Sequence, residues 1–363
     1  MTLDEEIDSL IIDDKSLSTE HVHSPSPFLP GTKIQYAFDS TTINDLKTCP
    51  RLYYYKHIEG WASKDESIHL RFGIEVHLAL QQYDISRSNG IEHEDALHDV
   101  VRELMERTAN WTVDESTKVG KYKNRSNLVG LVIDYLDAHV NDPAETYIMA
   151  DGKPAVELSF QFELDWGPEA SQIAHDVEVE YGERMTVLST MEHAQPYILS
   201  GHLDKVVTLH GALLVKDYKT TTTATSSFYF NQFEPHTQMT LYTLAGKVVL
   251  NAPIRGVAID ALQILLEEPH RFTRGFTYRT PDQLDEFLND LAILFRENEA
   301  YATQNYWPMR ESGCSNYRSE AEGRTGCPFR DICSKSPSVR DRFLRADFIK
   351  LPEDQKWNPL KPR

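Results

Sequence analysis

The chain has 363 residues, 40% hydrophobic and 26% charged, a composition typical of a globular protein with a sizeable core. Its formal net charge of −19, from 37 basic and 56 acidic residues, argues against a general polyanion-binding protein. No apolar run approaches the roughly 18 residues that a membrane span needs. The acidic start MTLDEEIDSLIIDD also lacks the basic segment of a signal peptide, so we expect a cytoplasmic protein.

Helical periodicity dominates the first part of the chain. Residues 1–31 combine acids with a Ser/Pro-rich stretch and are predicted to form a disordered acidic tail. Apolar residues at helical spacing then predict four helices, over 40–58, 69–84, 93–111 and 127–140. We expect them to form the helical part, about 40–150, of a single domain that spans 32–345.

Strand patterns begin after Pro154. Alternating and apolar runs predict strands over 155–164, 197–209, 213–219 and 254–265, with a helix over 234–250 before the last strand. A long helix over 281–305 and a Cys- and Arg-containing segment follow, and residues 346–363 are expected to be a tail. The order of helix, three strands, helix and strand predicts an α/β catalytic core over about 154–266, followed by a C-terminal helix and cysteine segment over about 280–345. No phosphate-binding loop of the G-x-x-x-x-G-K-[ST] type occurs.

Two acids stand on neighbouring predicted strands. Asp204 and Asp217 are thirteen residues apart, and an antiparallel hairpin would bring their carboxylates close together. Two such carboxylates repel unless a divalent cation lies between them, and oxygen ligands suit Mg²⁺ or Mn²⁺. Lys219 projects from the same strand face as Asp217. The alternative, a surface ion pair at a strand end, stays open on this triplet alone.

Four motifs occur in one order along the chain. They are a G-x-x-x-H helix, a G-x-x-D strand, a (D/E)-x-K strand and a Q-x-x-x-Y helix, and they stand as Gly73 to His77, Gly201 to Asp204, Asp217 to Lys219, and Gln238 to Tyr242. In these motifs the chain resembles the RecB-type exonuclease branch of the PD-(D/E)XK nuclease superfamily, which includes AddB nuclease domains and CRISPR-associated RecB-like exonucleases. The resemblance spans about residues 40–335 and implies a restriction-endonuclease-like core with a helical N-terminal extension.

The resemblance also implies residue roles. Asp204 and Asp217 would be metal ligands, together with His77 and the carbonyl of Tyr218, and Lys219 would be the catalytic lysine. Gln238 and Tyr242 share a helix face and would support Lys219, although a packing pair is the alternative for them. Glu157 on the preceding strand is either a further acid near the metal or a charge on the strand face.

The four cysteines form a second pattern. Cys49 precedes Pro-Arg-Leu-Tyr-Tyr, whereas Cys314, Cys327 and Cys333 lie together near the C-terminus, and C-x12-C-x5-C alone is a poor zinc signature. The arrangement is similar to that of iron–sulfur RecB-type nucleases, which implies a [4Fe–4S] cluster on four thiolates. Many relatives have C-x2-C within the triplet, so zinc or a three-cysteine site remains the alternative. Side chains that could contact DNA near these cysteines are Arg51, Tyr54, Arg318, Arg324 and Arg330.

The expected function is a metal-dependent DNA exonuclease that acts on single-stranded or free DNA ends in recombination, repair or processing. The alternatives are an endonuclease of the same superfamily and a non-catalytic DNA-binding or assembly subunit that keeps the fold. Without a motor, the protein would work alone or with a helicase, recombinase or integration complex. A bacterial or phage-infected cytoplasm, including the nucleoid, fits this expectation, as does a phage origin.

Overall fold

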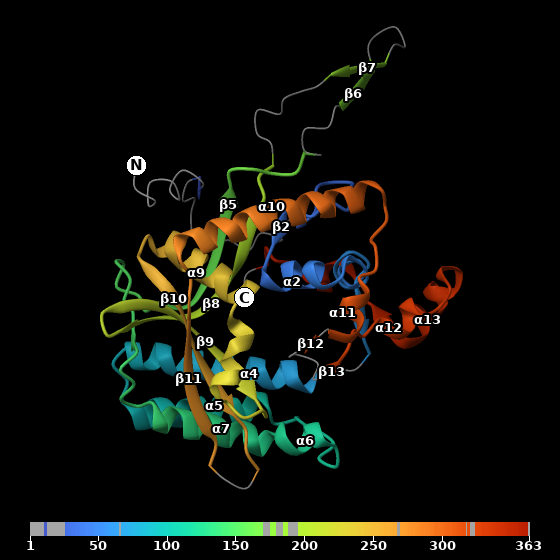
Figure 1. Cartoon of the computed structure of the whole chain (residues 1–363). Helices are drawn as coiled ribbons and strands as arrows, with labels where there is room; N and C mark the ends of the chain where they lie inside the picture. The colour runs from blue at the N-terminus through green and yellow to red at the C-terminus, as the bar shows by residue number, and fades with distance from the viewer. Residues whose placement is uncertain are drawn as a thin grey trace.

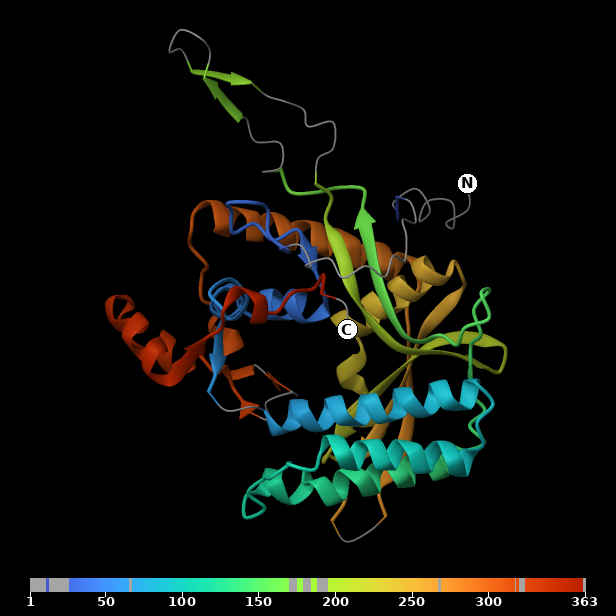
Figure 2. The same ribbon diagram turned by 180° about the vertical axis from the view of Figure 1, so that it is seen from behind.

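The computed structural model describes residues 26–64, 67–169, 195–266, 269–315 and 326–361 in full, and the backbone alone of 11–12, 175–178, 184–187, 316, 318–319 and 324–325. A mixed sheet lies between two layers of helices (Figures 1 and 2), which confirms the predicted α/β class. Most of the tail predicted over 1–31 lies outside the described residues. Within the described part, no helix is both long and apolar enough to cross a membrane.

The first predicted helix is broken at Cys49. Helix α2 (Ser40–Thr48) begins with a capping box between Asp39 and Thr42, and it ends where Cys49 adopts an extended conformation with φ −164°. A proline disfavours helical geometry in the residue before it, and Pro50 then opens α3 (Pro50–Tyr53) and the π-helical turn η1 (Tyr54–Ile58). The prediction of one continuous helix over 40–58 was therefore wrong at this point.

A helical layer covers one face of the sheet. It consists of α4 (Ile68–Ser88), α5 (His93–Arg107), α6 (Lys118–Tyr122) and α7 (Arg125–Ala138). Apolar side chains such as Val76, Val100 and Leu131 pack together and against Tyr218 and Leu262 of the sheet. The helices predicted over 69–84, 93–111 and 127–140 correspond to α4, α5 and α7.

The sheet has the strand order β1-β5-β8-β9-β10-β11, with β2 and β4 also paired to β8. Its long strands are β5 (Val156–Leu164), β8 (Ile198–Leu209), β9 (Ala212–Thr221), β10 (Ile254–Gln263) and β11 (Arg271–Tyr278). The short ones are β1 (Ile11–Ile12), β2 (Ala37–Phe38) and β4 (Glu145–Thr146). Strands β9 and β10 are parallel, as are β2 and β8, whereas β8 is antiparallel to both β5 and β9. Sequence patterns did not predict β11, whose residues are mostly part-exposed at the sheet edge and give little apolar alternation.

The ladder between β8 and β9 is short. It runs from the Leu209–Ala212 pair near the turn to the Lys205–Lys216 pair and goes no further. Beyond that point β8 continues along β5 and β9 continues along β10. The two central strands therefore separate one residue before Asp204 and Asp217.

Helices α9 (Thr237–Leu250) and α10 (Pro281–Thr303) cover the opposite face (Figures 1 and 2). The main core lies there and includes Val215, Leu241 and Leu291. Helix α9 connects β9 to its parallel neighbour β10, as a crossover must. The other short elements are β3 (Trp61–Ser63), β6 (His175–Glu178), β7 (Arg184–Val187), α8 (Ser227–Phe230), η3 (Asn231–Phe233), α11 (Glu311–Asn316), β12 (Arg318–Ser319), β13 (Arg324–Thr325), α12 (Arg330–Cys333), η4 (Pro337–Val339), α13 (Arg340–Asp347), β14 (Phe348–Lys350) and η5 (Glu353–Gln355).

Residues 346–361, predicted to form a tail, pack against the domain. Strand β14 pairs with β3 near the start of the chain. Ser200 Oγ on β8 donates to the Pro359 carbonyl at 2.8 Å, and Trp357 Nε1 donates to Asp39 Oδ2 at 2.8 Å. These contacts join segments more than 150 residues apart, which a local sequence pattern cannot reveal.

Candidate active site

Where β8 and β9 separate, polar side chains from both strands meet others from α4 and α9. Asp204 is on β8 and Asp217 on β9, and both are buried. The Tyr218 amide, freed from the ladder, donates to Asp204 Oδ2 at 3.2 Å. A side-chain contact thus takes the place of a backbone pair, and the sequence-predicted acids meet across the gap.

His77 of α4 reaches this gap from the helical layer. Its Nδ1 lies 3.2 Å from Asp204 Oδ1, and its Nε2 lies 3.1 Å from the Tyr218 carbonyl. Both neighbours are acceptors, so both contacts are made only by the doubly protonated imidazolium. Burial alone would lower the pKa of His77, but the adjacent Asp204 carboxylate raises it above its usual value.

The glycine of the same motif, Gly73, lies about one turn before His77 on α4. A Cβ atom built at Gly73 meets no atom within 4 Å in the described structure. The space in front of Gly73 is open.

Lys219 lies on the other side of Asp217. Its Nζ is 3.1 Å from Asp217 Oδ2 and donates to Gln238 Oε1 at 2.9 Å. Gln238 Nε2 in turn donates to the Tyr242 hydroxyl at 3.0 Å, across one turn of α9. The helix therefore fixes the amide that orients the lysine, so Gln238 and Tyr242 are more than a packing pair.

The two carboxylates at this gap are matched by Lys219 and, only while it is protonated, by His77, so a divalent cation could take the place of the His77 proton. Burial raises the pKa of Asp217 to about 6, with the Asp204 charge adding to the shift and Lys219 opposing it. Burial also acts on Asp204, but His77 lowers its pKa below the usual value. Asp217 Oδ2 is buried and makes no hydrogen bond of good geometry with a described residue, although the Lys219 ammonium lies 3.1 Å from it. Two buried carboxylates side by side are a suitable donor set for Mg²⁺ or Mn²⁺.

Glu157 lies opposite Asp204. Its neighbours Val156 and Leu158 pair with Lys205 and Leu203 of β8. Its backbone has a φ of +49°, which is strained for a residue with a Cβ atom. Glu157 therefore has a strained backbone at a strand position beside the acids, and the residue is partly buried there.

The four cysteines share one neighbourhood although 265 residues separate Cys49 from Cys314 in sequence. None forms a disulfide. Arg310 joins two of them, because its amide donates to Cys49 Sγ at 3.3 Å and its carbonyl lies 3.9 Å from Cys314 Sγ. Cys49, Cys327 and Cys333 belong to one apolar cluster with Leu52 and Phe329. Burial, together with the nearby thiols, raises the pKa of Cys327 to about 12.

The residues predicted to contact DNA near the cysteines divide into three groups. Tyr54 stacks on Trp307 with ring centroids 4.5 Å apart, and Arg51 Nε donates to the Trp307 carbonyl at 2.9 Å, so both pack within the protein. Arg330 is exposed. The side chains of Arg318 and Arg324 lie outside the described residues.

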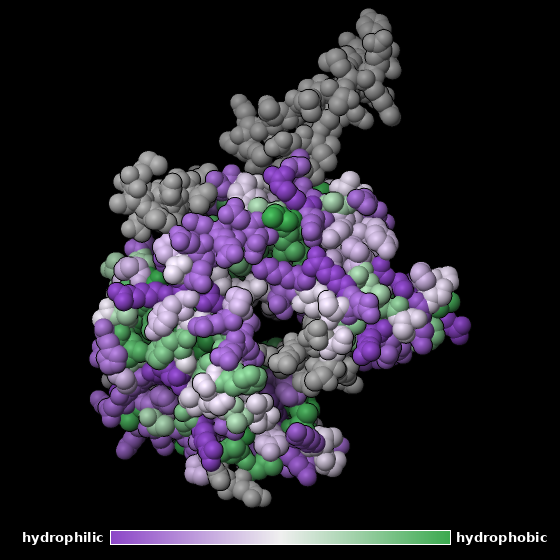
Figure 3. All heavy atoms as spheres, viewed as in Figure 1, coloured by the Kyte–Doolittle hydropathy of each residue, from purple (hydrophilic) through white to green (hydrophobic). Residues whose placement is uncertain are grey.

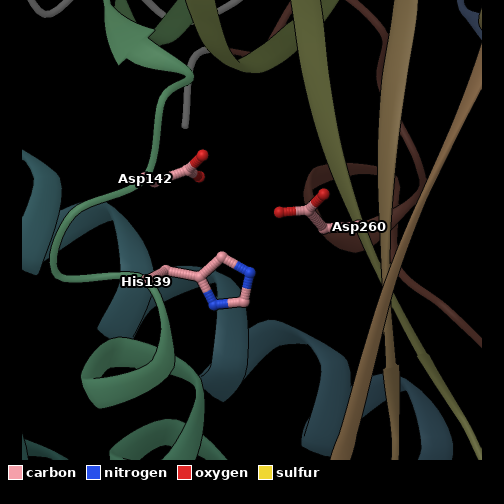
Figure 4. Close-up of side chains that lie close together, drawn as sticks. All are labelled: His139, Asp142 and Asp260. Atoms are coloured by element: carbon pink, nitrogen blue, oxygen red, sulfur yellow. The ribbon is translucent and has the colours of Figure 1, made fainter.

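A second group of potential ligands lies on the opposite face of the sheet. His139, Asp142 and Asp260 place ligand atoms within 4.8 Å of one another and face a common space (Figure 4). Arg274 contacts both carboxylates at 2.5 to 2.8 Å, and Lys216 Nζ lies 2.9 and 3.0 Å from them. Two cations already neutralise two anions, so the group is a buried ion-pair network between the sheet and α7 that leaves no excess negative charge for a metal ion.

Sequence patterns missed this network and one further carboxylate, Asp84. Asp260 stands in its strand as an isolated charge among apolar residues, which was the available signal for a buried partner. Asp84 lies seven residues after His77 on α4, which places both on one helix face.

Residues 40–334 match the family model of the PD-(D/E)XK nuclease superfamily. The matched span begins at α2 and includes every motif residue of the candidate site and all four cysteines. No curated protein matches the chain.

Metal affinity is expected to fall as the pH is lowered. Asp217 must be ionised and His77 deprotonated to act as ligands, and the pKa of Asp217 is about 6. Mn²⁺ binding should therefore be about tenfold or more weaker at about pH 5 than at about pH 7.5. Isothermal titration of the metal-free protein at both pH values measures this. An affinity that does not change with pH would contradict the assignment of these ligands.

The ion-pair network is expected to stabilise the fold without metal. Asp260→Ala leaves Lys216 and Arg274 with a single carboxylate, and removal of one partner of a buried pair costs about 3 kcal/mol. Urea unfolding measures the loss. Asp341→Ala, which removes the exposed pair with Arg345, is the control and should change the free energy of unfolding little. Equal losses in the two variants would refute a structural role for the network.

Proposed function

Because the chain belongs to the PD-(D/E)XK nuclease superfamily, we propose that it is a Mg²⁺- or Mn²⁺-dependent deoxyribonuclease of the RecB-type exonuclease branch. The observation that carries the proposal is the arrangement at the β8–β9 gap. Asp204 and Asp217 face one space, His77 closes one side of it, and Lys219, held by Gln238, closes the other. These are the residue types that phosphodiester hydrolysis needs.

Each side chain has a separable task in this reaction. Asp204, Asp217, His77 and the Tyr218 carbonyl would hold the divalent cation, which polarises the phosphate and makes a bound water more acidic. Lys219 orients the attacking water and stabilises the negative charge that develops on the phosphate oxygens. Gln238 and Tyr242 fix the direction of the Lys219 ammonium group. His77 loses the proton that it shares with Asp204 before it can act as a ligand.

A [4Fe–4S] cluster at Cys49, Cys314, Cys327 and Cys333 belongs to the same proposal. Four unpaired thiols in one apolar neighbourhood suit a soft metal site. A cluster bound by these cysteines would close a loop of 265 residues between Cys49 and Cys314. Such a closure stabilises the fold chiefly by restricting the conformations of the unfolded chain. We propose a structural role for the cluster, since α3 and α12, which flank these cysteines, carry none of the residues at the β8–β9 gap.

The substrate that we propose is single-stranded DNA with a free end. Among the described residues, Figure 3 shows a hollow at the level between α2 and α4 of Figure 1, and α4 carries His77. The resemblance of the four motifs to those of RecB-type exonucleases is what favours an exonuclease over an endonuclease. With no phosphate-binding loop in the sequence, strand separation during recombination or repair would fall to a helicase or another partner.

Lys219→Ala is expected to reduce DNA cleavage about 100-fold or more, because it removes the group that stabilises the developing charge. The assay uses end-labelled linear single-stranded DNA and a covalently closed circle in the presence of Mg²⁺ or Mn²⁺. Lys153→Ala, at a lysine whose side chain is 76% exposed, is the matched control and should cleave as the wild type does.

The two substrates separate the alternatives. Cleavage of the circle would replace the exonuclease by an endonuclease. Wild-type protein that binds DNA without cutting it would favour a non-catalytic subunit. Full activity of Lys219→Ala would contradict the assigned mechanism.

The cluster is expected to give brown protein with equal amounts of iron and acid-labile sulfide after anaerobic purification. Cys327→Ser should lose most of the iron and unfold at a lower temperature, because the cysteines lie on segments from both ends of the domain. Metal analysis and thermal unfolding measure the two effects. Ser315→Ala, beside Cys314 on α11, is the control. Colourless protein that contains zinc would refute the iron–sulfur assignment.

A further inference from the structure

Asp84 lies behind the candidate metal site, on the face of the sheet that the helical layer covers. We propose that Asp84 is a positioning residue for the metal ligands, because it binds Lys205 of β8 and Tyr218 of β9 at the point where these strands separate. The inference rests on the proposed function and deepens it. Asp84 touches none of the reacting atoms, so its effect would pass through the strands that it joins.

The two oxygens of Asp84 have different partners. Lys205 Nζ lies 2.6 Å from Oδ1, and the Tyr218 hydroxyl donates to Oδ2 at 3.2 Å. The side chains of Lys205 and Asp84 are only 7% and 13% exposed, so their ion pair is weakly screened by solvent. One carboxylate therefore bridges two strands from outside the sheet.

The Asp84 bridge lies just beyond the last backbone pair between β8 and β9. The last ladder pair between β8 and β9 joins Lys205 to Lys216, and Asp204 and Asp217 come next on each strand. Past that pair, each strand follows a different neighbour. On the site face the Tyr218 amide binds Asp204, and on the opposite face Asp84 binds Tyr218 and Lys205. The gap is thus held on both faces.

The bridge also fixes the helix that carries His77. Asp84 is seven residues, or about two turns, after His77 on α4. A shift of α4 along the sheet would move both residues together. Lys205 follows Asp204, and Tyr218 lies between Asp217 and Lys219. Each partner of Asp84 is therefore covalently adjacent to a proposed ligand or to the catalytic lysine.

This constraint opposes a specific force. Asp204 and Asp217 repel each other when ionised and free of metal, and the repulsion would widen the gap between the strands. Replacing a residue that orients metal ligands without contacting the metal typically lowers metal affinity or activity 10- to 100-fold. Asp84 is placed to have an effect of that kind.

The test measures Mn²⁺ binding to the full-length, DNA-free protein by isothermal titration, together with the Mn²⁺ concentration needed for half-maximal cleavage. Asp84→Asn keeps the side-chain shape but loses the charge that binds Lys205, and should bind Mn²⁺ about tenfold or more weakly. Its cleavage should recover at high Mn²⁺. Asp45→Asn is the control, since it removes the charge of a carboxylate that is even more buried and pairs with Lys56 and His57, and it should lower the melting temperature without changing Mn²⁺ affinity.

A second pair of variants removes one hydroxyl each. Tyr218→Phe deletes the donor to Asp84, and Tyr135→Phe deletes the comparable donor to Asp260 in the same interface. We expect weaker Mn²⁺ binding only for Tyr218→Phe. If Asp84→Asn does not fold, this pair decides the question by itself.

The outcomes separate this inference from the proposed function. Unchanged Mn²⁺ affinity in Asp84→Asn and Tyr218→Phe, or an equal loss in their controls, would overturn the positioning role even if the wild type cleaves DNA. Weaker Mn²⁺ binding in these two variants alone would support it even if the wild type cleaves no DNA. A wild type that binds no Mn²⁺ would overturn it as well.

Discussion

The candidate site depends on the early separation of two neighbouring strands. A hairpin that stayed paired would satisfy the backbone of Tyr218 within the ladder and leave no space between Asp204 and Asp217. Because the β8–β9 ladder stops at Lys205 and Lys216, the Tyr218 amide turns to Asp204, and its carbonyl faces His77. Two buried carboxylates then share one space, and burial and mutual repulsion raise the pKa of Asp217. Two neighbouring carboxylates in this buried gap repel each other, and a bound cation would relieve that repulsion.

The other face of the sheet bears a balanced set of charges. Lys216 and Arg274 are matched by Asp142 and Asp260, and Lys205 is matched by Asp84. Because side chains alternate along a strand, Lys205 and Lys216, which are next to Asp204 and Asp217 in sequence, point into the helical layer. Each is paired there with a carboxylate, so these buried charges help to hold α4 and α7 against the sheet. At the candidate site, the two carboxylates are matched by Lys219 and by a His77 that must be protonated, and a bound cation would take the place of that proton.

Sequence patterns identified the motif residues and predicted most of the long helices and strands, because motifs and hydrophobic periodicity are both features of short stretches of sequence. The hairpin of β8 and β9 follows from two apolar runs around a Gly-containing turn, and the spacing of thirteen residues then brings Asp204 near Asp217. Asp84 and Lys205 are 121 residues apart, and neither belongs to a motif, so their contact depends on how α4 docks on the sheet. The paired C-terminal strand β14 was missed for the same reason, since its partner β3 lies near the start of the chain.

Helix α2 links the cysteine neighbourhood to the candidate site. Cys49 ends the helix because Pro50 excludes a further helical residue there. Two positions earlier, Lys47 Nζ lies 3.5 Å from the hydroxyl of Thr237, the first residue of α9. Gln238, which orients Lys219, follows directly. A metal bound at Cys49, as proposed, would hold the end of α2, and α2 contacts the helix that carries Gln238, the partner of Lys219.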